Sequence, residues 1–128
     1  MTNYQFEIEW YGHCCYKIVY AGITFLLDPY DTFQSIDCGI IKSNYLLSSS
    51  SWHDHGHIGA SPMSQVFTYP GEYNFDKGFT IYGIKTFESR GSQNTIFSVH
   101  FNDGFSFTNF ADWGDENGIS KLTKKELA

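Results

Sequence analysis

Alternation of apolar and polar residues recurs along the chain and predicts β-strands. In the segment 6–10, phenylalanine, isoleucine and tryptophan alternate with two glutamates, so the apolar side chains would share one face of a strand. The segment 6–20 is predicted to form two short strands or one bent strand, because Gly12 interrupts the run. Further strand candidates cover residues 44–48, 66–69, 79–87, 95–101 and 104–110.

Turn residues between the apolar runs indicate how these strands connect. Ala21-Gly22 separates two apolar runs, 17–20 and 23–27, by two residues, which is the spacing of a hairpin. An Asp-Gly pair at 103–104 gives the same prediction further along. Asp28-Pro29 follows the second run directly and ends that strand, since proline cannot donate a hydrogen bond to a ladder.

Helical patterns are scarce. Residues 120–127 begin with a serine at the N-cap position and carry a leucine stripe, which predicts one helix. Residues 58–63 are predicted to start a short helix that Pro62 limits. A total of about seven or eight strands and one or two short helices favours a mostly-β member of the α+β class, with one domain over residues 1–128.

The composition narrows the range of partners and locations. The chain has 8 lysines and arginines against 14 acidic residues, and its net charge of −6 disfavours nucleic acid. No apolar run reaches the ~18 residues that cross a bilayer, and the polar start does not resemble a secretory signal, so no membrane partner is expected. Three cysteines, two of them adjacent, do not form a disulfide framework and predict a reducing, cytoplasmic location.

The strongest chemical signal is a cluster of histidines directly after the apolar run 44–48. His53, His55 and His57 stand close together with Asp54 among them. Imidazole nitrogens and a carboxylate near the end of a strand are ligands that zinc and similar metals prefer. The sequence therefore predicts a divalent metal site in this stretch.

Motifs over nearly the whole chain resemble one known family. Aligned without gaps, the segment 46–56 is similar to the apolar strand and Thr-His-x-His-x-Asp-His motif of the metallo-β-lactamase superfamily, whose Asp-His pair falls on Asp54 and His55. Other motifs of the chain resemble the ascorbate-6-phosphate lactonase-like branch of metal-dependent hydrolases. The resemblance implies half of an αββα sandwich, with the chain ending where the family continues into its second half. The motifs of this chain that resemble the lactonase-like branch are Trp-Tyr-Gly-His-Cys-Cys-Tyr at 10–16, Ile-Thr-Phe-Leu-Leu-Asp-Pro-Tyr at 23–30, Tyr-Pro-Gly-Glu-Tyr at 69–73, Asn-Thr-Ile-Phe at 94–97, Asn-Phe-Ala-Asp-Trp-Gly at 109–114 and Leu-Thr-Lys-Lys-Glu-Leu at 122–127.

The resemblance also implies two adjacent metal sites, of which the first has lost its ligands. Aligned without gaps, the three histidines of that site are replaced by Ser50, Trp52 and Glu88. An indole nitrogen is a hydrogen-bond donor only and cannot ligate a metal. The first site is therefore predicted not to assemble.

The second implied site keeps more of its ligands. It retains Asp54, His55 and the bridging Asp112, and lacks a histidine from the second half of the family fold. Together with Glu88 these groups are predicted to hold one divalent ion, zinc or manganese. Their oxygen atoms favour manganese or magnesium.

Two other interpretations of the histidine cluster stay open. In a register shifted by one residue, His53, His55 and His57 take the family histidine positions and project to one face of an extended strand. Alternatively, the cluster is a solvated polar loop retained from an enzymatic ancestor.

Residues outside the cluster also have two interpretations each. The resemblance places His13 close to the metal centre and Asp28 in the pocket floor. Without a metal, His13 would be half-buried and bonded to backbone, and Asp28 would cap a turn. Cys14-Cys15 falls in a predicted strand, where one thiol points inward and is expected to fill the core rather than act as a nucleophile.

Two classes of function follow. The first is a non-catalytic binding or interaction module with an impaired metal site. The alternative is a residual metal-dependent hydrolase of a phosphorylated sugar, lactone or phosphoester, in which Asp54 orients a metal-bound water and His57 or His13 acts as an acid. A homodimer is expected to cover the sheet face that the family's second half would cover, and a small molecule is the other expected partner.

Overall fold

The fold is built almost entirely from β-strands. A computed structural model describes residues 5–31, 37–50, 55–89 and 91–114, and within these ranges it has nine strands and one short 3-10 helix. Two sheets, of five and four strands, account for the strands, so the predicted mostly-β half of a sandwich is confirmed. The chain divides into two compact units, Met1–Thr68 and Tyr69–Ala128, each with its own sheet. One domain over residues 1–128 stays a prediction.

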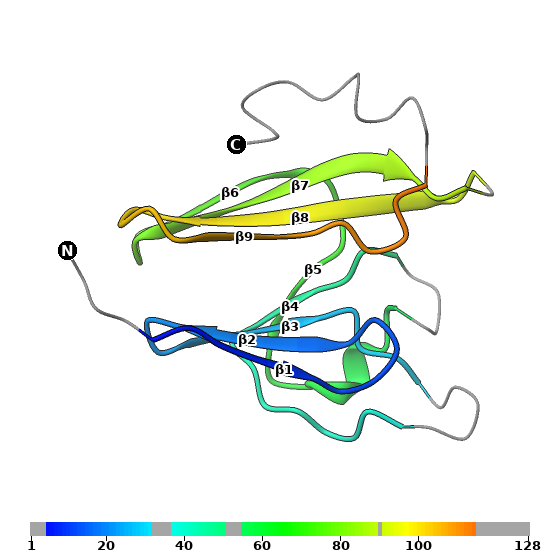
Figure 1. Ribbon diagram of the computed structural model, residues 1–128, viewed down its shortest axis with the longest axis horizontal. Coiled ribbons are helices and arrows are strands. Elements are labelled where there is room, and N and C mark those ends of the chain that lie inside the picture. The colour runs from blue at the N-terminus through cyan, green and yellow to red at the C-terminus, as the bar shows by residue number, and fades with distance from the viewer. Residues whose placement is uncertain (1–4, 32–36, 51–54, 90, 115–128) are drawn as a thin grey trace. The chain divides into compact units, whose positions relative to one another are not determined.

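The first unit contains a mixed five-stranded sheet with the order β1-β2-β3-β4-β5 (Figure 1). Strands β1, β2 and β3 pair antiparallel, whereas β3, β4 and β5 pair parallel. The carboxyl ends of β3 and β4 therefore meet at one end of the sheet. The strands are β1 (Glu7–Trp10), β2 (Tyr16–Tyr20), β3 (Ile23–Leu27), β4 (Tyr45–Leu47) and β5 (Gln65–Phe67).

The predicted hairpin between the second and third strands is confirmed. Tyr20 pairs with Ile23, which leaves a two-residue turn between β2 and β3. Both turn residues have positive φ, 53° at Ala21 and 76° at Gly22. This is the backbone of a type I′ turn, whose twist matches that of the flanking strands. The glycine supplies one positive φ at no steric cost, and the alanine adopts the other under the constraint of the paired strands.

The core of the first unit lies under the middle of its sheet. Leu26 and Leu46 come from the neighbouring strands β3 and β4 and are fully buried. Because both faces of these central strands are covered, their residues are apolar without alternation, as the sequence of β4 shows. The cluster consists of Cys15, Leu26, Tyr30, Cys38, Ile41, Leu46 and Ala60.

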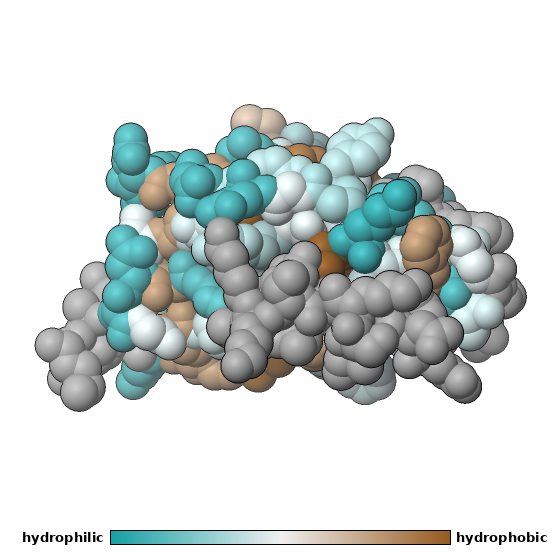
Figure 2. All heavy atoms as spheres, turned by 90° about the horizontal axis from the view of Figure 1, so that it is seen from above, coloured by the Kyte–Doolittle hydropathy of each residue, from teal (hydrophilic) through white to brown (hydrophobic). Residues whose placement is uncertain are grey.

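The second unit is an antiparallel meander of four strands. It contains β6 (Gly71–Phe75), β7 (Phe79–Phe87), β8 (Gln93–Phe101) and β9 (Ser106–Asn109) in that order. Between β8 and β9, the predicted Asp-Gly turn is present: Gly104 has φ 101°, and Asp103 Oδ1 accepts a hydrogen bond from the Phe105 amide at 2.9 Å. Among the residues that Figure 2 colours, hydrophilic and hydrophobic side chains are interspersed on the face seen from above.

Two sequence expectations differ from the fold. Strand β6 was not among the strand candidates, because its apolar residues Tyr73 and Phe75 are only half-buried and the run begins in a Pro-Gly turn. The helix expected over 58–63 is a single 3-10 turn, Ile58–Ala60. The predicted helix at 120–127 lies outside the described residues. In the part of the chain that is described, no helix has the length and apolar character needed to span a membrane.

Candidate metal site

The polar groups of the first unit gather where its central strands end. Leu27, the last residue of β3, pairs with Leu47 of β4 on one side and with Tyr16, the first residue of β2, on the other. Three segments consequently meet at this end of the sheet: the turn before β2, the residues after β3 and the residues after β4. Ligands commonly bind at the carboxyl ends of parallel strands.

Asp28 connects the residues after β3 to those after β4 through its carboxylate. Its side chain is fully buried, and its carboxylate accepts hydrogen bonds from the amide and the hydroxyl of Ser49, at 2.7 and 2.8 Å. The same carboxylate lies 3.2 Å from Nδ1 of His55. Asp28 has a φ of 47°, and its own amide donates to the Leu47 carbonyl at 3.1 Å. The placement of Asp28 in a pocket floor stays a prediction; what the structure shows is a buried carboxylate that holds Ser49 and lies next to His55.

His55 is held in place from two sides. Only 3% of the residue is exposed, and its backbone carbonyl accepts a hydrogen bond from Ser48 Oγ at 3.1 Å. A buried carboxylate next to Nδ1 favours the tautomer in which Nδ1 carries the proton and donates to Asp28. In that tautomer Nε2 carries the lone pair, which is the form of imidazole that binds a metal.

The turn between β1 and β2 brings two more donor groups to the same end of the sheet. Hydrogen bonds from the Tyr11 amide to the Cys15 carbonyl, at 2.9 Å, and from the Cys15 amide to the Gly12 carbonyl, at 3.0 Å, close this turn. Gly12 and His13 both have positive φ, 91° and 49°. The His13 side chain is exposed and Cys14 is half-buried.

His13, Cys14 and His55 form a group that can hold a metal ion. One ligand atom from each residue lies within 4.8 Å of the others. The two imidazole rings have a centroid separation of 5.7 Å. Two nitrogens and a sulfur are ligand atoms of zinc sites in proteins.

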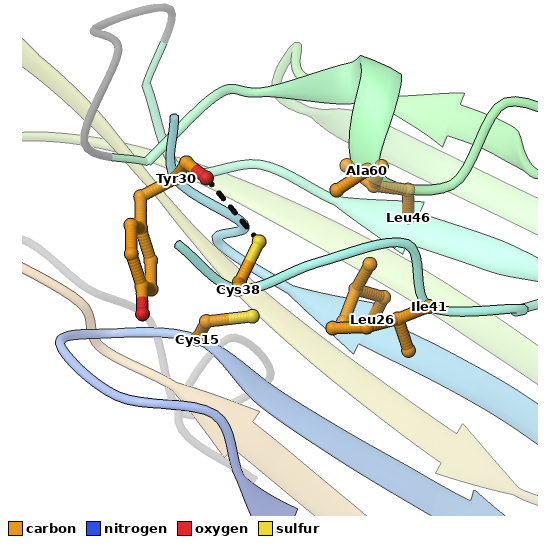
Figure 3. Close-up of a cluster of buried hydrophobic side chains, with 7 residues drawn as sticks. All are labelled: Cys15, Leu26, Tyr30, Cys38, Ile41, Leu46 and Ala60. Atoms are coloured by element: carbon orange, nitrogen blue, oxygen red, sulfur yellow. Dashed lines mark hydrogen bonds between the residues drawn. The ribbon is translucent and has the colours of Figure 1, made fainter. Parts of the chain in front are cut away.

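The other two thiols belong to the core. In the cluster that Figure 3 shows, Cys38 Sγ donates to the Tyr30 carbonyl at 3.2 Å, and Cys15 is fully buried. Burial raises the pKa of the Cys15 thiol and of the Cys38 thiol. Protonated, buried thiols are poor nucleophiles and poor metal ligands, so the core-filling interpretation holds for Cys15.

The histidine cluster is only partly described. His53 and Asp54 lie outside the described residues, so their predicted roles as metal ligands, and that of Asp54 in catalysis, stay predictions. The His57 amide donates to the Pro29 carbonyl at 2.9 Å. The His57 ring covers Gly59, where an added Cβ would lie 3.2 Å from Cε1. The role of His57 as an acid stays a prediction.

The remaining predicted ligands belong to the second unit. Glu88 Oε1 accepts a hydrogen bond from the Ser92 amide at 3.2 Å, and the Glu88 backbone forms an isolated bridge with Trp113. Asp112 is exposed, and its amide donates to the Asn94 side chain at 3.3 Å. Metal binding by Glu88 and Asp112 stays a prediction.

A buried asparagine shapes the turn that carries Asp112. The Asn94 amide group donates to Thr86 Oγ1 at 3.1 Å and to the Phe110 carbonyl at 3.2 Å, while its oxygen accepts from the Asp112 amide. Ala111, within this turn, has a φ of 51°. Asn94 therefore fixes an irregular backbone that hydrogen bonds within a ladder could not hold.

Comparison with known protein families shows the superfamily to which the chain belongs. Residues 7–116 match the family described as the beta-lactamase superfamily domain. The chain belongs to this superfamily. Comparison with curated proteins gave no match. The resemblance to the metallo-β-lactamase superfamily is thus confirmed, and its ascorbate-6-phosphate lactonase-like branch stays a prediction.

Two solved structures share the superfamily fold. A Thermotoga maritima protein, named as a Zn-dependent hydrolase of the metallo-beta-lactamase superfamily, is 24% identical with a TM-score of 0.63, and the match covers 96% of this chain and 55% of that one. A Parabacteroides distasonis protein, named as a metal-dependent hydrolase, is 11% identical with a TM-score of 0.57, over 77% of this chain and 57% of that one. The chain therefore spans little more than half the length of either protein.

A metal ion is the group that the superfamily fold implies, and the first unit has ligands for one. The buried Asp28 carboxylate orients His55 from behind, as carboxylates do for metal-binding histidines. His13 and Cys14 add a nitrogen and a sulfur within reach. Of these groups, the sequence interpretation had assigned Cys14 no metal role. The position of His13 and Cys14 directly after a glycine, which permits an irregular backbone, is the signal that could have pointed to Cys14.

Proposed function

We propose that this chain is a non-catalytic binding module of the metallo-β-lactamase superfamily, with an impaired metal centre. The observation that carries the proposal is the buried Asp28–Ser49–His55 network, which persists beside positions that have lost their imidazoles. Those positions are Ser50 and Trp52. A buried polar network of this kind without the ligands of the first metal site supports binding more than turnover.

The chemistry of the replaced residues supports this proposal. Hydrolysis on a two-metal centre requires one ion that generates the nucleophile and a second that clamps the substrate. A serine hydroxyl is a poor ligand and an indole is none, so Ser50 and Trp52 do not replace two imidazoles. The Glu88 carboxylate, at the third position, accepts a hydrogen bond from its own turn.

The ligand would be a small polar molecule at the carboxyl ends of β3 and β4. Motif similarity supports a place beside the ascorbate-6-phosphate lactonase-like branch, so phosphorylated sugars, lactones and phosphoesters are the ligand classes to test first. A metal bound at this site would act as a Lewis acid toward a ligand oxygen. Asp28 would keep His55 oriented, and the buried end of the site would exclude water from that side.

Hydrolysis assays test the proposal. The purified chain, loaded with zinc or manganese, is offered a lactone, a sugar phosphate and an aryl phosphodiester, with the His55→Ala variant as the control. We expect turnover no faster than that of the variant for every substrate. Metal-dependent turnover by the natural chain that His55→Ala abolishes would refute the non-catalytic assignment.

A residual metal-dependent hydrolase is the second candidate. The metal-binding group of His13, Cys14 and His55 favours it, because one metal with an open coordination position suffices for some hydrolases. In that case Asp54 would orient the nucleophilic water and His57 would act as the acid. Loss of turnover in both Asp54→Asn and His57→Gln, with metal content unchanged, is the result that this candidate predicts.

A homodimer and a cytoplasmic location complete the proposal. Strand β1 is an edge of its sheet. Its apolar residues Ile8 and Trp10 are 57% and 63% exposed, and Phe6, directly before the strand, is 47% exposed, which supports pairing with a second copy. Cys14, Cys15 and Cys38 lie in the described part of the chain and form no disulfide, as expected in a reducing compartment. Sedimentation of the natural chain and of Ile8→Lys tests the dimer: the natural chain should sediment as a dimer and the variant as a monomer.

A further inference from the structure

We propose that His13, Cys14 and His55 bind one zinc ion, with the Cys14 thiolate as a ligand. This inference rests on the proposed retention of the pocket and names the ion that the pocket holds. Its ligands differ from those that the superfamily motif implies, because one is a sulfur and two come from the turn between β1 and β2.

The geometry requires only side-chain adjustment. In a tetrahedral zinc site, bond lengths of about 2.0–2.3 Å place the ligand atoms roughly 3.3–3.6 Å apart. In this chain the three ligand atoms lie within 4.8 Å of one another. Closing the difference takes rotations of the exposed His13 and the half-buried Cys14, while the buried His55 stays fixed.

The backbone explains how adjacent residues reach one ion. In a regular strand, successive side chains point to opposite faces, so His13 and Cys14 could not bind the same metal ion. Positive φ at Gly12 and at His13 turns the chain here, and the Trp10 Nε1 group donates to the His13 carbonyl at 2.9 Å, which secures the turn. The φ of 49° at His13 is uncommon outside glycine and is found preferentially at functional sites.

Asp28 fixes the third ligand before the metal arrives. Its carboxylate is held by the amide and the hydroxyl of Ser49 and faces Nδ1 of His55 at 3.2 Å. Donation from Nδ1 leaves the lone pair on Nε2 for the metal. A ligand with a fixed tautomer and orientation loses little freedom on binding, which favours affinity.

The donor set selects the metal. Two imidazoles and a thiolate suit zinc, whereas manganese and magnesium prefer oxygen ligands. The oxygen-rich site for manganese or magnesium, with Asp54, Asp112 and Glu88, stays a separate prediction. Three protein ligands leave the fourth position of a tetrahedral zinc ion to a ligand or a solvent molecule.

Cobalt substitution tests the role of the thiolate directly, without any measure of turnover. The reduced, metal-free chain is titrated with cobalt and with zinc, and the ultraviolet thiolate-to-cobalt charge-transfer band is recorded. We expect one equivalent of either metal to bind and the band to appear with cobalt. Cys14→Ser should abolish the band and weaken zinc binding by more than the 10–100-fold typical of outer-shell changes.

Two controls keep the test decisive. Cys38→Ala removes a buried core thiol and should leave the band and the zinc affinity unchanged. His13→Asn keeps a residue that tolerates positive φ, so it should fold like the natural chain and still lose zinc affinity. Circular dichroism confirms folding of each variant. A band that persists in Cys14→Ser, no band in the natural chain, or manganese binding as tight as zinc binding would overturn the inference.

The outcomes separate this inference from the proposed function. Absence of zinc binding with no turnover contradicts the metal site and leaves the binding module standing. Zinc binding through Cys14 together with metal-dependent turnover supports the metal site and refutes the non-catalytic assignment.

Discussion

Asp28→Asn separates the structural role of the Asp28 carboxylate from its role toward a metal. The substitution keeps the shape of the side chain and removes its charge. Asparagine adopts positive φ as readily as aspartate, so the φ of 47° at this position adds no strain. What changes is the hydrogen bonding to Ser49 and His55.

The loss of stability in Asp28→Asn can be estimated from two short hydrogen bonds. The amide and the hydroxyl of Ser49 donate to the Asp28 carboxylate at 2.7 and 2.8 Å in a buried site. Bonds to a charged acceptor contribute about 1 kcal/mol more than bonds to a neutral one, so the variant should lose roughly 2 kcal/mol of unfolding free energy. For the 128 residues of the chain this lowers the melting temperature by about 7 °C.

The effect on metal binding should be larger than the loss of stability suggests. In Asp28→Asn, the amide NH2 group faces Nδ1 of His55 and donates a hydrogen bond to it. Nδ1 must then carry the lone pair, so the imidazole proton lies on Nε2. In that tautomer Nε2 cannot bind a metal. Loss of an outer-shell partner of this kind typically weakens metal affinity by about 10–100-fold.

Competition with a chromogenic chelator gives the zinc affinity, and thermal unfolding of the metal-free chain gives the stability. The matched control is Asp37→Asn, an exposed carboxylate that accepts a hydrogen bond from the Gly39 amide at 2.7 Å. The control should change neither quantity appreciably. Zinc affinity in Asp28→Asn equal to that of the control would refute the claim that Asp28 sets the tautomer of His55.

Three further predictions concern stability, each measured by urea denaturation. Burial raises the pKa of the Cys38 thiol, so the folded state holds this proton to higher pH than the unfolded state. Above pH ~8.5 this thiol should lower the unfolding free energy by about 1.4 kcal/mol per pH unit, in addition to the contribution of the buried Cys15 thiol, and a slope unchanged in Cys38→Ala would contradict this. Gly83→Ala places a Cβ 2.9 Å from the Tyr69 carbonyl oxygen and should lower the unfolding free energy by about 1–3 kcal/mol. Lys85→Ala, at an exposed position of the same strand, should change it little, and equal effects of the two substitutions would refute the close approach at Gly83. Asn94→Ala leaves buried groups without partners and should cost about 2–3 kcal/mol, and a loss below 0.5 kcal/mol would exclude its role in the turn.

The strands could be predicted where local pattern and tertiary burial agree. The run 23–27 is apolar and is followed by Asp28-Pro29, and Ala21-Gly22 before it has the two-residue spacing of a hairpin. Strand β6 was missed because a half-exposed strand shows little alternation of apolar and polar residues. Its pairing with β7 stabilises it, and this pairing cannot be read from the sequence of β6 alone.

The candidate site was only partly accessible from the sequence. The resemblance pointed to Asp28, His13 and His55, which the structure brings to one end of the first sheet. Cys14 was assigned to a strand, where its neighbour His13 would face the opposite side. The positive φ at His13 reverses that expectation, and no side-chain pattern encodes it, because only Gly12 hints at an irregular backbone.

Native mass spectrometry of the reduced chain titrated with zinc tests the central claim most directly, because it counts the ions that each chain holds. We predict a species with one zinc ion per chain that saturates at one equivalent and is lost in His55→Ala. A species with two zinc ions per chain, filled with similar affinity, would mean that a two-metal centre assembles despite Ser50 and Trp52, and would contradict the prediction of an impaired metal centre.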